Sequence, residues 1–141
     1  MGEEQTNADL FAAVPLFKGL GPNELKSLSS TSKTVQFKAG DYIVREGEAG
    51  LGFYVIASGQ ATVRKRGKTV AKLHRGDFFG EMALLDNQPR SAAVVAEDST
   101  KCIILLRWNF WALVSNNKKI ARALLEEMAK RLRAANEALT N

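Results

Sequence analysis

Apolar residues change their spacing along the chain in three stretches. In the first stretch, 7–32, they recur at largely helical intervals: Leu10, Phe11, Val14, Leu16, Phe17, Leu20, Leu25 and Leu28. Pro15 and the segment 19–22 interrupt this pattern, because proline and glycine break helices. The first stretch therefore predicts two or three short helices.

Between residues 34 and 106 the apolar residues fall in short segments separated by glycine. The predicted strands are 35–38, 42–45, 53–57, 61–65, 69–73, 92–96 and 101–106. Eight of the eleven glycines lie at turns in this stretch. Short strands with such turns are typical of small antiparallel barrels and jelly rolls. We expect an α+β, mainly β fold: an antiparallel β jelly-roll barrel flanked by short N-terminal helices and by C-terminal helices.

After residue 107 the spacing is helical again. It predicts a short helix over 108–114 and a longer one, capped by Ser115 or Asn116, that ends near residue 139. Apolar residues of the longer helix alternate four and three apart, as in a coiled coil: Ala121, Leu125, Met128, Leu132, Ala135 and Leu139. Either the helix packs on its own barrel or it forms a homodimer contact. The row is shorter than the roughly three to four heptads that would decide between them.

Length and composition set the broad class. With 141 residues, 45% of them hydrophobic, the chain suffices for one compact domain, whose parts we place at 7–32, 34–106 and 107–139. A single cysteine, Cys102, forms no internal disulfide, and the first ten residues are too polar for a signal peptide. We therefore expect a cytoplasmic protein. No segment approaches the roughly 18 apolar residues of a membrane span.

The chain is basic, with a net charge of +5 and a pI near 9.5. Part of the excess lies around Gly67 in a predicted hairpin, at Arg64, Lys65, Arg66 and Lys68. Charges at such a turn normally face solvent and protect a strand edge. No aromatic residues are interleaved with them, as single-strand nucleic-acid binding requires. The charge alone therefore does not indicate a nucleic-acid partner.

One acid and one arginine stand nine positions apart in segment 79–93, which reads FGEMALLDNQPRSAA. A short helix over 80–85 directs its first backbone amides at a phosphate. Arg90 adds a guanidinium whose planar donors match phosphate oxygens in pairs. A phosphate repels Glu81, so this acid requires a hydrogen-bond donor such as a ribose 2′-hydroxyl. The spacing suits a small sugar-phosphate ligand.

This segment resembles the phosphate-binding cassette of cyclic-nucleotide-binding domains, which occur in catabolite-activator-type regulators, cyclic-nucleotide-dependent kinases and cyclic-nucleotide-gated channels. The likeness extends beyond 79–93. Segment 40–48, GDYIVREGE, resembles the first barrel signature of the family, and 53–61, FYVIASGQA, resembles the second. Residues 16–25 are similar to the helical segment before the barrel. The resemblance implies one cyclic-nucleotide-binding domain over 1–141.

The resemblance also assigns roles within the cassette. In the family the glutamate matching Glu81 binds the ribose 2′-hydroxyl, and the arginine matching Arg90 is the counter-ion of the phosphate. The cyclic-nucleotide-binding residues expected from it are Gly80, Glu81, Met82, Ala83, Arg90, Ser91 and Ala92.

Residues outside the cassette are expected to contact the base. Val63 and Leu73, on strands near the cassette, are candidates for an apolar wall. The resemblance to the catabolite-activator group places Leu132, Ala135 and Asn136 of the last helix at the base. For Asn136 an ordinary polar position near a helix end is the alternative interpretation.

Ser91 leaves the identity of the base open. In the kinases of the family an alanine after the arginine goes with cyclic AMP and a threonine with cyclic GMP. Serine or threonine also occurs in bacterial and channel members that bind cyclic AMP. A hydroxyl both donates and accepts, so Ser91 can meet a guanine amino group or the phosphate. Cyclic AMP is favoured, and cyclic GMP stays an alternative.

The resemblance implies a non-catalytic sensor with no cofactor beyond its cyclic nucleotide. We expect its C-terminal helices to signal to an effector protein, since 141 residues leave no room for a DNA-binding domain, a kinase or a channel, unless the sequence is an excised or truncated module. Two alternatives stay open: a ligand-independent interaction module and a small cupin-type barrel enzyme. The enzyme alternative is weakened because His74 is the only histidine, and we expect no metal site.

Overall fold

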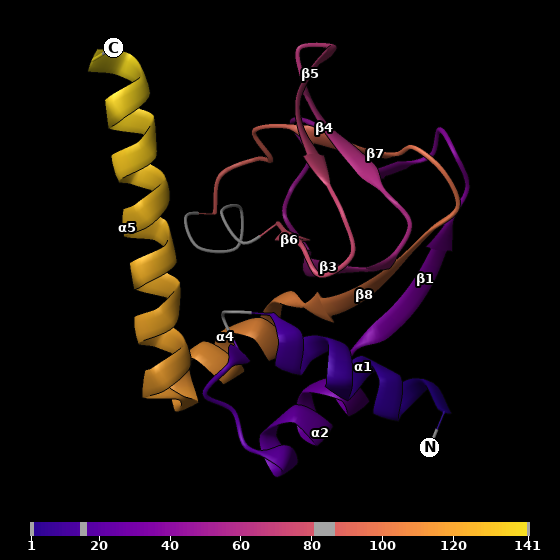
Figure 1. The fold of residues 1–141 in the computed structure, drawn as a ribbon, viewed down its shortest axis with the longest axis vertical. Helices are drawn as coiled ribbons and strands as arrows, with labels where there is room; N and C mark the ends of the chain where they lie inside the picture. The colour runs from indigo at the N-terminus through magenta and orange to yellow at the C-terminus, as the bar shows by residue number, and fades with distance from the viewer. Residues whose placement is uncertain (1, 15–16, 81–86, 141) are drawn as a thin grey trace.

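Figure 1 shows a β structure flanked by helices, in a computed structural model that describes residues 2–14, 17–80 and 87–140. The helices are α1 (Gly2–Ala13), α2 (Pro22–Thr31), α4 (Arg107–Asn116) and α5 (Lys118–Thr140). The strands are β1 (Lys33–Phe37), β2 (Tyr42–Val44), β3 (Gly52–Ser58), β4 (Ala61–Lys65), β5 (Lys68–Leu73), β6 (Phe78–Phe79), β7 (Ala93–Ala96) and β8 (Thr100–Leu106). Among the helices described, none is long and apolar enough to cross a membrane.

The strands form two four-stranded antiparallel sheets. One sheet has the order β1-β8-β3-β6 and the other the order β2-β7-β4-β5. Each sheet therefore combines strands from both halves of the β region, which is the arrangement of a double-sheet jelly roll. The predicted fold class, α+β and mainly β with flanking helices, is confirmed.

Strand β6 is the one described strand that the spacing does not predict. Its two residues are too few for an alternating pattern. It pairs with β3 through Phe79 opposite Tyr54 and Phe78 opposite Val55. This short pairing places the start of the cassette beside the middle of β3.

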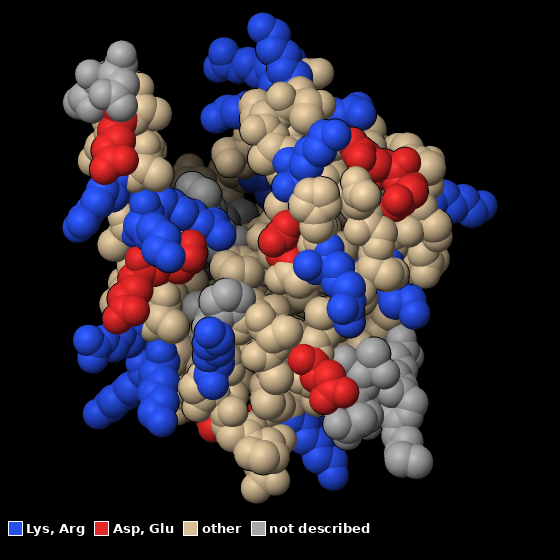
Figure 2. Space-filling model, viewed as in Figure 1, with Lys and Arg blue, Asp and Glu red and all other residues tan. Residues whose placement is uncertain are grey.

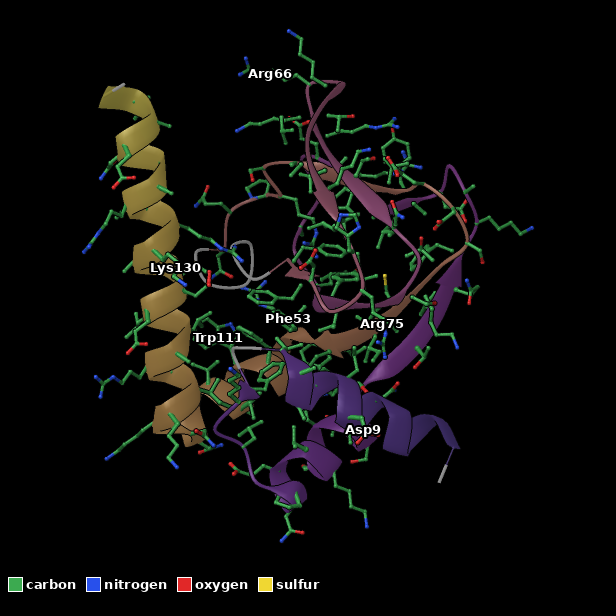
Figure 3. The ribbon with its side chains drawn as sticks, in the orientation of Figure 1. Asp9, Phe53, Arg66, Arg75, Trp111 and Lys130 are labelled. Carbon is green, nitrogen blue, oxygen red and sulfur yellow. The ribbon has the colours of Figure 1, made fainter. Side chains whose placement is uncertain are left out.

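Two apolar cores lie on the two faces of β3, because successive side chains of a strand point to opposite faces. Phe53 and Val55 belong to the core between the first sheet and the helices. There Phe53 stacks on Phe110 of α4, with ring centroids 5.3 Å apart. Figure 3 shows Phe53 and Trp111 where this sheet meets the helices. Ile56 faces the second core, between the sheets.

Cys102 on β8 is a fully buried member of the second core. Burial disfavours the thiolate and raises the pKa of this thiol from 9.0 to about 12. Cys102 is therefore a small apolar residue of the core at neutral pH.

Helix α5 begins after Asn117, whose side-chain Oδ1 accepts a hydrogen bond from the Ile120 backbone N–H at 3.1 Å. The prediction that Ser115 or Asn116 caps this helix is wrong, because α4 continues through both residues. Only Asn117 has the extended backbone, with φ −138° and ψ 104°, that suits an N-cap.

The first turns of α5 hold it to the rest of the molecule. Ile120 and Leu124 are buried in the core under the first sheet. By contrast, Leu125, Leu132 and Leu139 of the predicted apolar row are 71%, 63% and 85% exposed. Figure 1 shows the later turns of α5 standing beside the jelly roll. A homodimer contact along this row stays a prediction, which a mass measurement with and without nucleotide tests.

Candidate functional site

A cavity of about 290 Å³ lies among β4, β5, β6, the segment before β7 and α5. Figure 2 shows the surface hollowed between the upper half of α5 and the jelly roll. The volume is close to the lower end of the range of about 300–1,000 Å³ that small-molecule sites occupy. Six predicted site residues line the cavity: Val63, Leu73, Gly80, Arg90, Ser91 and Ala92.

Arg90 brings a positive charge to this cavity although it is only 7% exposed. Its Nη2 donates a hydrogen bond to the Gly52 carbonyl at 3.2 Å. Its backbone N–H donates to the Glu48 carbonyl, and its own carbonyl accepts from the Gly47 N–H, both at 2.8 Å. The turn after β2 therefore holds the backbone of Arg90, while β3 holds its side chain.

Gly80 gives the Arg90 guanidinium the space that it occupies. Its backbone has φ +96°, a conformation that residues with a side chain rarely adopt. A Cβ atom at this position would lie 2.7 Å from the Gly52 carbonyl oxygen and 3.1 Å from Arg90 Nη1. The glycine thus allows the cassette backbone to pass close to both β3 and the arginine.

Tyr54 of β3 lies beneath the arginine. The Cζ atom of Arg90 is over the Tyr54 ring, 5.4 Å from its centroid. Phe79 stacks on Tyr54 with centroids 4.9 Å apart and an interplanar angle of 12°. Burial raises the pKa of the Tyr54 phenol above its usual 10.0, and the nearby Arg90 charge partly opposes this rise.

The hairpin of β4 and β5 supplies an apolar wall. Val63 pairs with Ala71, and Leu73 pairs with Ala61, so Val63 and Leu73 are diagonal neighbours on one face of the hairpin. Both line the cavity, together with the aromatic ring of Phe78. The structure thus places Val63 and Leu73 together at the cavity, and their contact with a base stays a prediction.

Arg131 of α5 also lines the cavity, and the sequence interpretation omits it. Its Cζ lies 5.2 Å from the centroid of the Phe78 ring, and its Nε lies 3.6 Å from Glu127 Oε2. Arg131 continues the helix face of the docked residues Ile120 and Leu124, since residues three and four apart share a face. Intervals of three and four residues, counted from Ile120 and Leu124, lead to Arg131 and are the signal that identifies it.

The other six predicted site residues form two groups. Three of them lie outside the described residues: Glu81, Met82 and Ala83. The other three, Leu132, Ala135 and Asn136, are exposed on α5 and are not among the residues that line the cavity. Leu132 is adjacent to Arg131, and one residue turns a helix by about 100°.

This arrangement suits a ligand with an anionic end and a flat apolar end. The guanidinium offers several hydrogen-bond donors to phosphate oxygens, and Val63 and Leu73 offer apolar surface to a ring. No group of three or more His, Cys, Asp or Glu side chains that can hold a metal occurs in 2–14, 17–80 or 87–140. His74 is exposed, as its position beside a turn predicts.

Two curated relatives show what the sequence is similar to. A cAMP-dependent protein kinase regulatory subunit of Emericella nidulans is 40% identical over 111 residues, which are 77% of this chain and 27% of that protein. A cGMP-dependent protein kinase of Drosophila melanogaster is 33% identical over 138 residues, 92% of this chain and 15% of that protein. The chain thus spans about a quarter or less of the length of these relatives.

A solved structure is similar in both fold and sequence. The catabolite activator protein of Thermus thermophilus superposes with a TM-score of 0.82 at 35% identity, over 89% of this chain and 62% of that one. The sequence model of the cyclic nucleotide-binding domain matches residues 34–117, which include every strand from β2 to β8. This match covers more than half of the chain, and the chain belongs to the cyclic nucleotide-binding domain family.

Proposed function

We propose that the chain is a non-catalytic sensor that binds a cyclic nucleotide in the cavity between the hairpin, the cassette and α5. One observation carries this proposal: a buried arginine and an apolar wall face the same cavity of about 290 Å³. A buried cation in such a cavity favours an anionic ligand group, since charge-assisted hydrogen bonds to phosphate are strong. A cyclic nucleotide joins such a group to a flat base.

The ligand lies in the cavity with its phosphate at Arg90 and its base against Val63 and Leu73. Gly80 lets the cassette backbone approach the phosphate. The roles of Glu81 at the ribose hydroxyl, and of Met82 and Ala83 at the phosphate, rest on the family resemblance.

Cyclic AMP is the favoured ligand, and cyclic GMP is the alternative. Ser91 lines the cavity and is exposed, so its hydroxyl is available to either ligand. The two relatives include one kinase subunit named for cAMP and one kinase named for cGMP. The preference for cyclic AMP rests on the occurrence of serine in bacterial members of the family that bind it.

The signal leaves through the C-terminal helices to an effector protein. Helix α5 buries Ile120 and Leu124 and packs Met128 partly against the same core, and Arg131, further along, lines the ligand cavity. A ligand shifts a conformational equilibrium only by its difference in affinity for the two states. If the ligand contacts Arg131 in one position of α5 and not in another, its affinity for the two states differs.

Calorimetric titration of folded, nucleotide-free protein with cyclic AMP and cyclic GMP tests the proposal. We expect both to bind, cyclic AMP more tightly, and Arg90→Ala to abolish measurable binding. Arg75→Ala is the matched control, because Arg75 is exposed and donates from Nε to the Ala57 carbonyl at 3.2 Å, away from the cavity lining. Absence of binding at high micromolar concentrations of both nucleotides would refute the sensor.

A further inference from the structure

Tyr54 lies directly behind the lining of the ligand cavity. It is not among the residues that line the cavity, whereas its neighbours Phe79, Gly80 and Arg90 are. The guanidinium lies over its ring at 5.4 Å, and Phe79 stacks on the ring within 4.9 Å. Tyr54 is thereby held between an aromatic partner and the buried cation.

The Tyr54 ring constrains the guanidinium in a way that a carboxylate does not. A cation over an aromatic face is attracted by the ring quadrupole, more strongly where water is excluded. A carboxylate in the same place would form paired hydrogen bonds with the guanidinium and compete with a phosphate for them. The ring attracts the cation without accepting hydrogen bonds from its N–H donors in the plane of the guanidinium.

The neighbouring contacts complete this support. The Gly52 carbonyl accepts one N–H of the guanidinium, and the backbone of Arg90 is tied on both sides to the turn at Gly47 and Glu48. A pre-organised arginine loses less side-chain entropy when a ligand binds. The ring of Tyr54 therefore contributes to affinity without touching the ligand.

We infer that Tyr54 is a positioning residue, whose aromatic face holds the Arg90 guanidinium, charged and pre-organised, toward the phosphate of the ligand. This inference rests on the proposed binding of cyclic nucleotides. The simpler alternative is that Tyr54 only fills space against Phe79. The positioning role requires an aromatic ring next to Arg90. The space-filling role requires only a side chain of similar volume.

Calorimetric titration of three variants with cyclic AMP separates these alternatives. Tyr54→Phe keeps the ring and is expected to bind within about twofold of the unmodified protein. Tyr54→Leu removes the ring and is expected to bind about five- to tenfold more weakly, the value of one cation–π contact. Tyr42→Leu is the matched control, because Arg45 Cζ lies 4.3 Å from the Tyr42 ring centroid at an exposed position. It is expected to leave affinity unchanged.

The second measurement needs no ligand. In the nucleotide-free protein, the Nε–H resonance of Arg90, assigned by its loss in Arg90→Lys, is expected to be shifted by the ring current of Tyr54. The shift persists in Tyr54→Phe and disappears in Tyr54→Leu. If Tyr54→Leu does not fold, Tyr54→Met serves, since methionine fills irregular space without an aromatic face.

The results separate failure of the Tyr54 inference from failure of the proposed function. Affinity of Tyr54→Leu within twofold of the unmodified protein, or an equal loss in Tyr42→Leu, overturns the inference. An unshifted Arg90 resonance in the nucleotide-free protein also overturns it. If the unmodified protein binds neither nucleotide, the proposed function fails instead, and the resonance still shows whether Tyr54 holds Arg90.

Discussion

Glu24 and Asn117, 93 residues apart in the chain, are joined by a hydrogen bond from Asn117 Nδ2 to Glu24 Oε2. Each residue also supports the start of its own helix. Glu24 Oε1 accepts from the Gly21 backbone N–H at 3.1 Å, before α2, and Asn117 Oδ1 accepts from the Ile120 N–H. The side chain of Asn117 thus uses its donor toward α2 and its acceptor toward α5, at the junction of α4 and α5.

Asn117→Asp is predicted to lower stability by about 1 kcal/mol, because it replaces the donor to Glu24 with a second carboxylate while keeping the acceptor at the start of α5. Adding Glu24→Gln supplies a donor on the opposite side and should recover much of the loss. Thermal unfolding of the two single variants and the double variant gives the coupling between the positions. Additive effects would mean that the two side chains do not interact in solution.

Gly80→Ala is predicted to lower both the stability of the protein and its affinity for nucleotide. Gly40→Ala is the matched control and is predicted to lower stability alone. Both glycines have positive φ, +96° and +91°, so each substitution carries a backbone cost of roughly 1–2 kcal/mol. Only at Gly80 does the new Cβ meet other atoms, the Gly52 carbonyl oxygen and Arg90 Nη1, whereas nothing lies within 4 Å at Gly40. Chemical denaturation and titration with cyclic AMP measure the two effects. We expect affinity to fall at least about tenfold for Gly80→Ala only, by displacement of a charged group that binds the ligand. Equal affinities of the two variants would place Gly80 outside the site.

Arg90→Lys is predicted to bind cyclic nucleotide more weakly by about ten- to a hundredfold, although it keeps the positive charge. Lysine lacks the planar set of donors that matches phosphate oxygens. It also lacks the flat group that lies over the Tyr54 ring. Titration calorimetry at two salt concentrations measures this loss. Full affinity in the lysine variant would show that charge alone suffices at this position.

Stability is predicted to fall above pH 9 through ionisation of Cys102. The folded pKa is raised to about 12, while the thiol of the unfolded chain ionises near 9.0. The contribution of the Cys102 thiol to the free energy of unfolding is therefore complete below pH 9 and is lost as pH rises from 9 through 12. Denaturant midpoints of the unmodified protein and Cys102→Ala, compared over this range, isolate the cysteine from other groups such as Tyr54. Parallel pH dependences of the two proteins would contradict the assignment.

The strands of the jelly roll were predictable because their patterns are local. Alternation in 53–57 identifies β3 and divides its residues between two cores, as Phe53 and Ile56 show. Strand β6 has only Phe78 and Phe79, and its existence depends on pairing with β3, which no local pattern records. Val63 and Leu73 could be assigned to strands from the sequence, but their common face depends on the pairing of β4 with β5.

The face of α5 that meets the cavity was not predictable from its apolar row. The row through Leu125, Met128 and Leu132 is the most regular pattern of the helix, yet both leucines are exposed and Met128 packs only partly against the core. Burial of Ile120 and Leu124 sets the rotation of the helix instead, and it turns Arg131 toward Phe78. An exposed face of a helix and a face that packs on the core show the same spacing of apolar residues. Only the tertiary contact distinguishes them.

The attachment of α5 through its first turns has a geometric consequence for signalling. The helix has 23 residues, and at a rise of about 1.5 Å per residue it is about 34 Å long. In the proposed signalling, the helix is a lever whose pivot is the buried pair Ile120 and Leu124. Thr140 lies 16 residues, or about 24 Å, beyond Leu124, so a tilt of about 10° at that pivot moves the far end by about 4 Å. The movement that we propose for Arg131 on ligand binding is thus larger at Thr140, the last residue of α5.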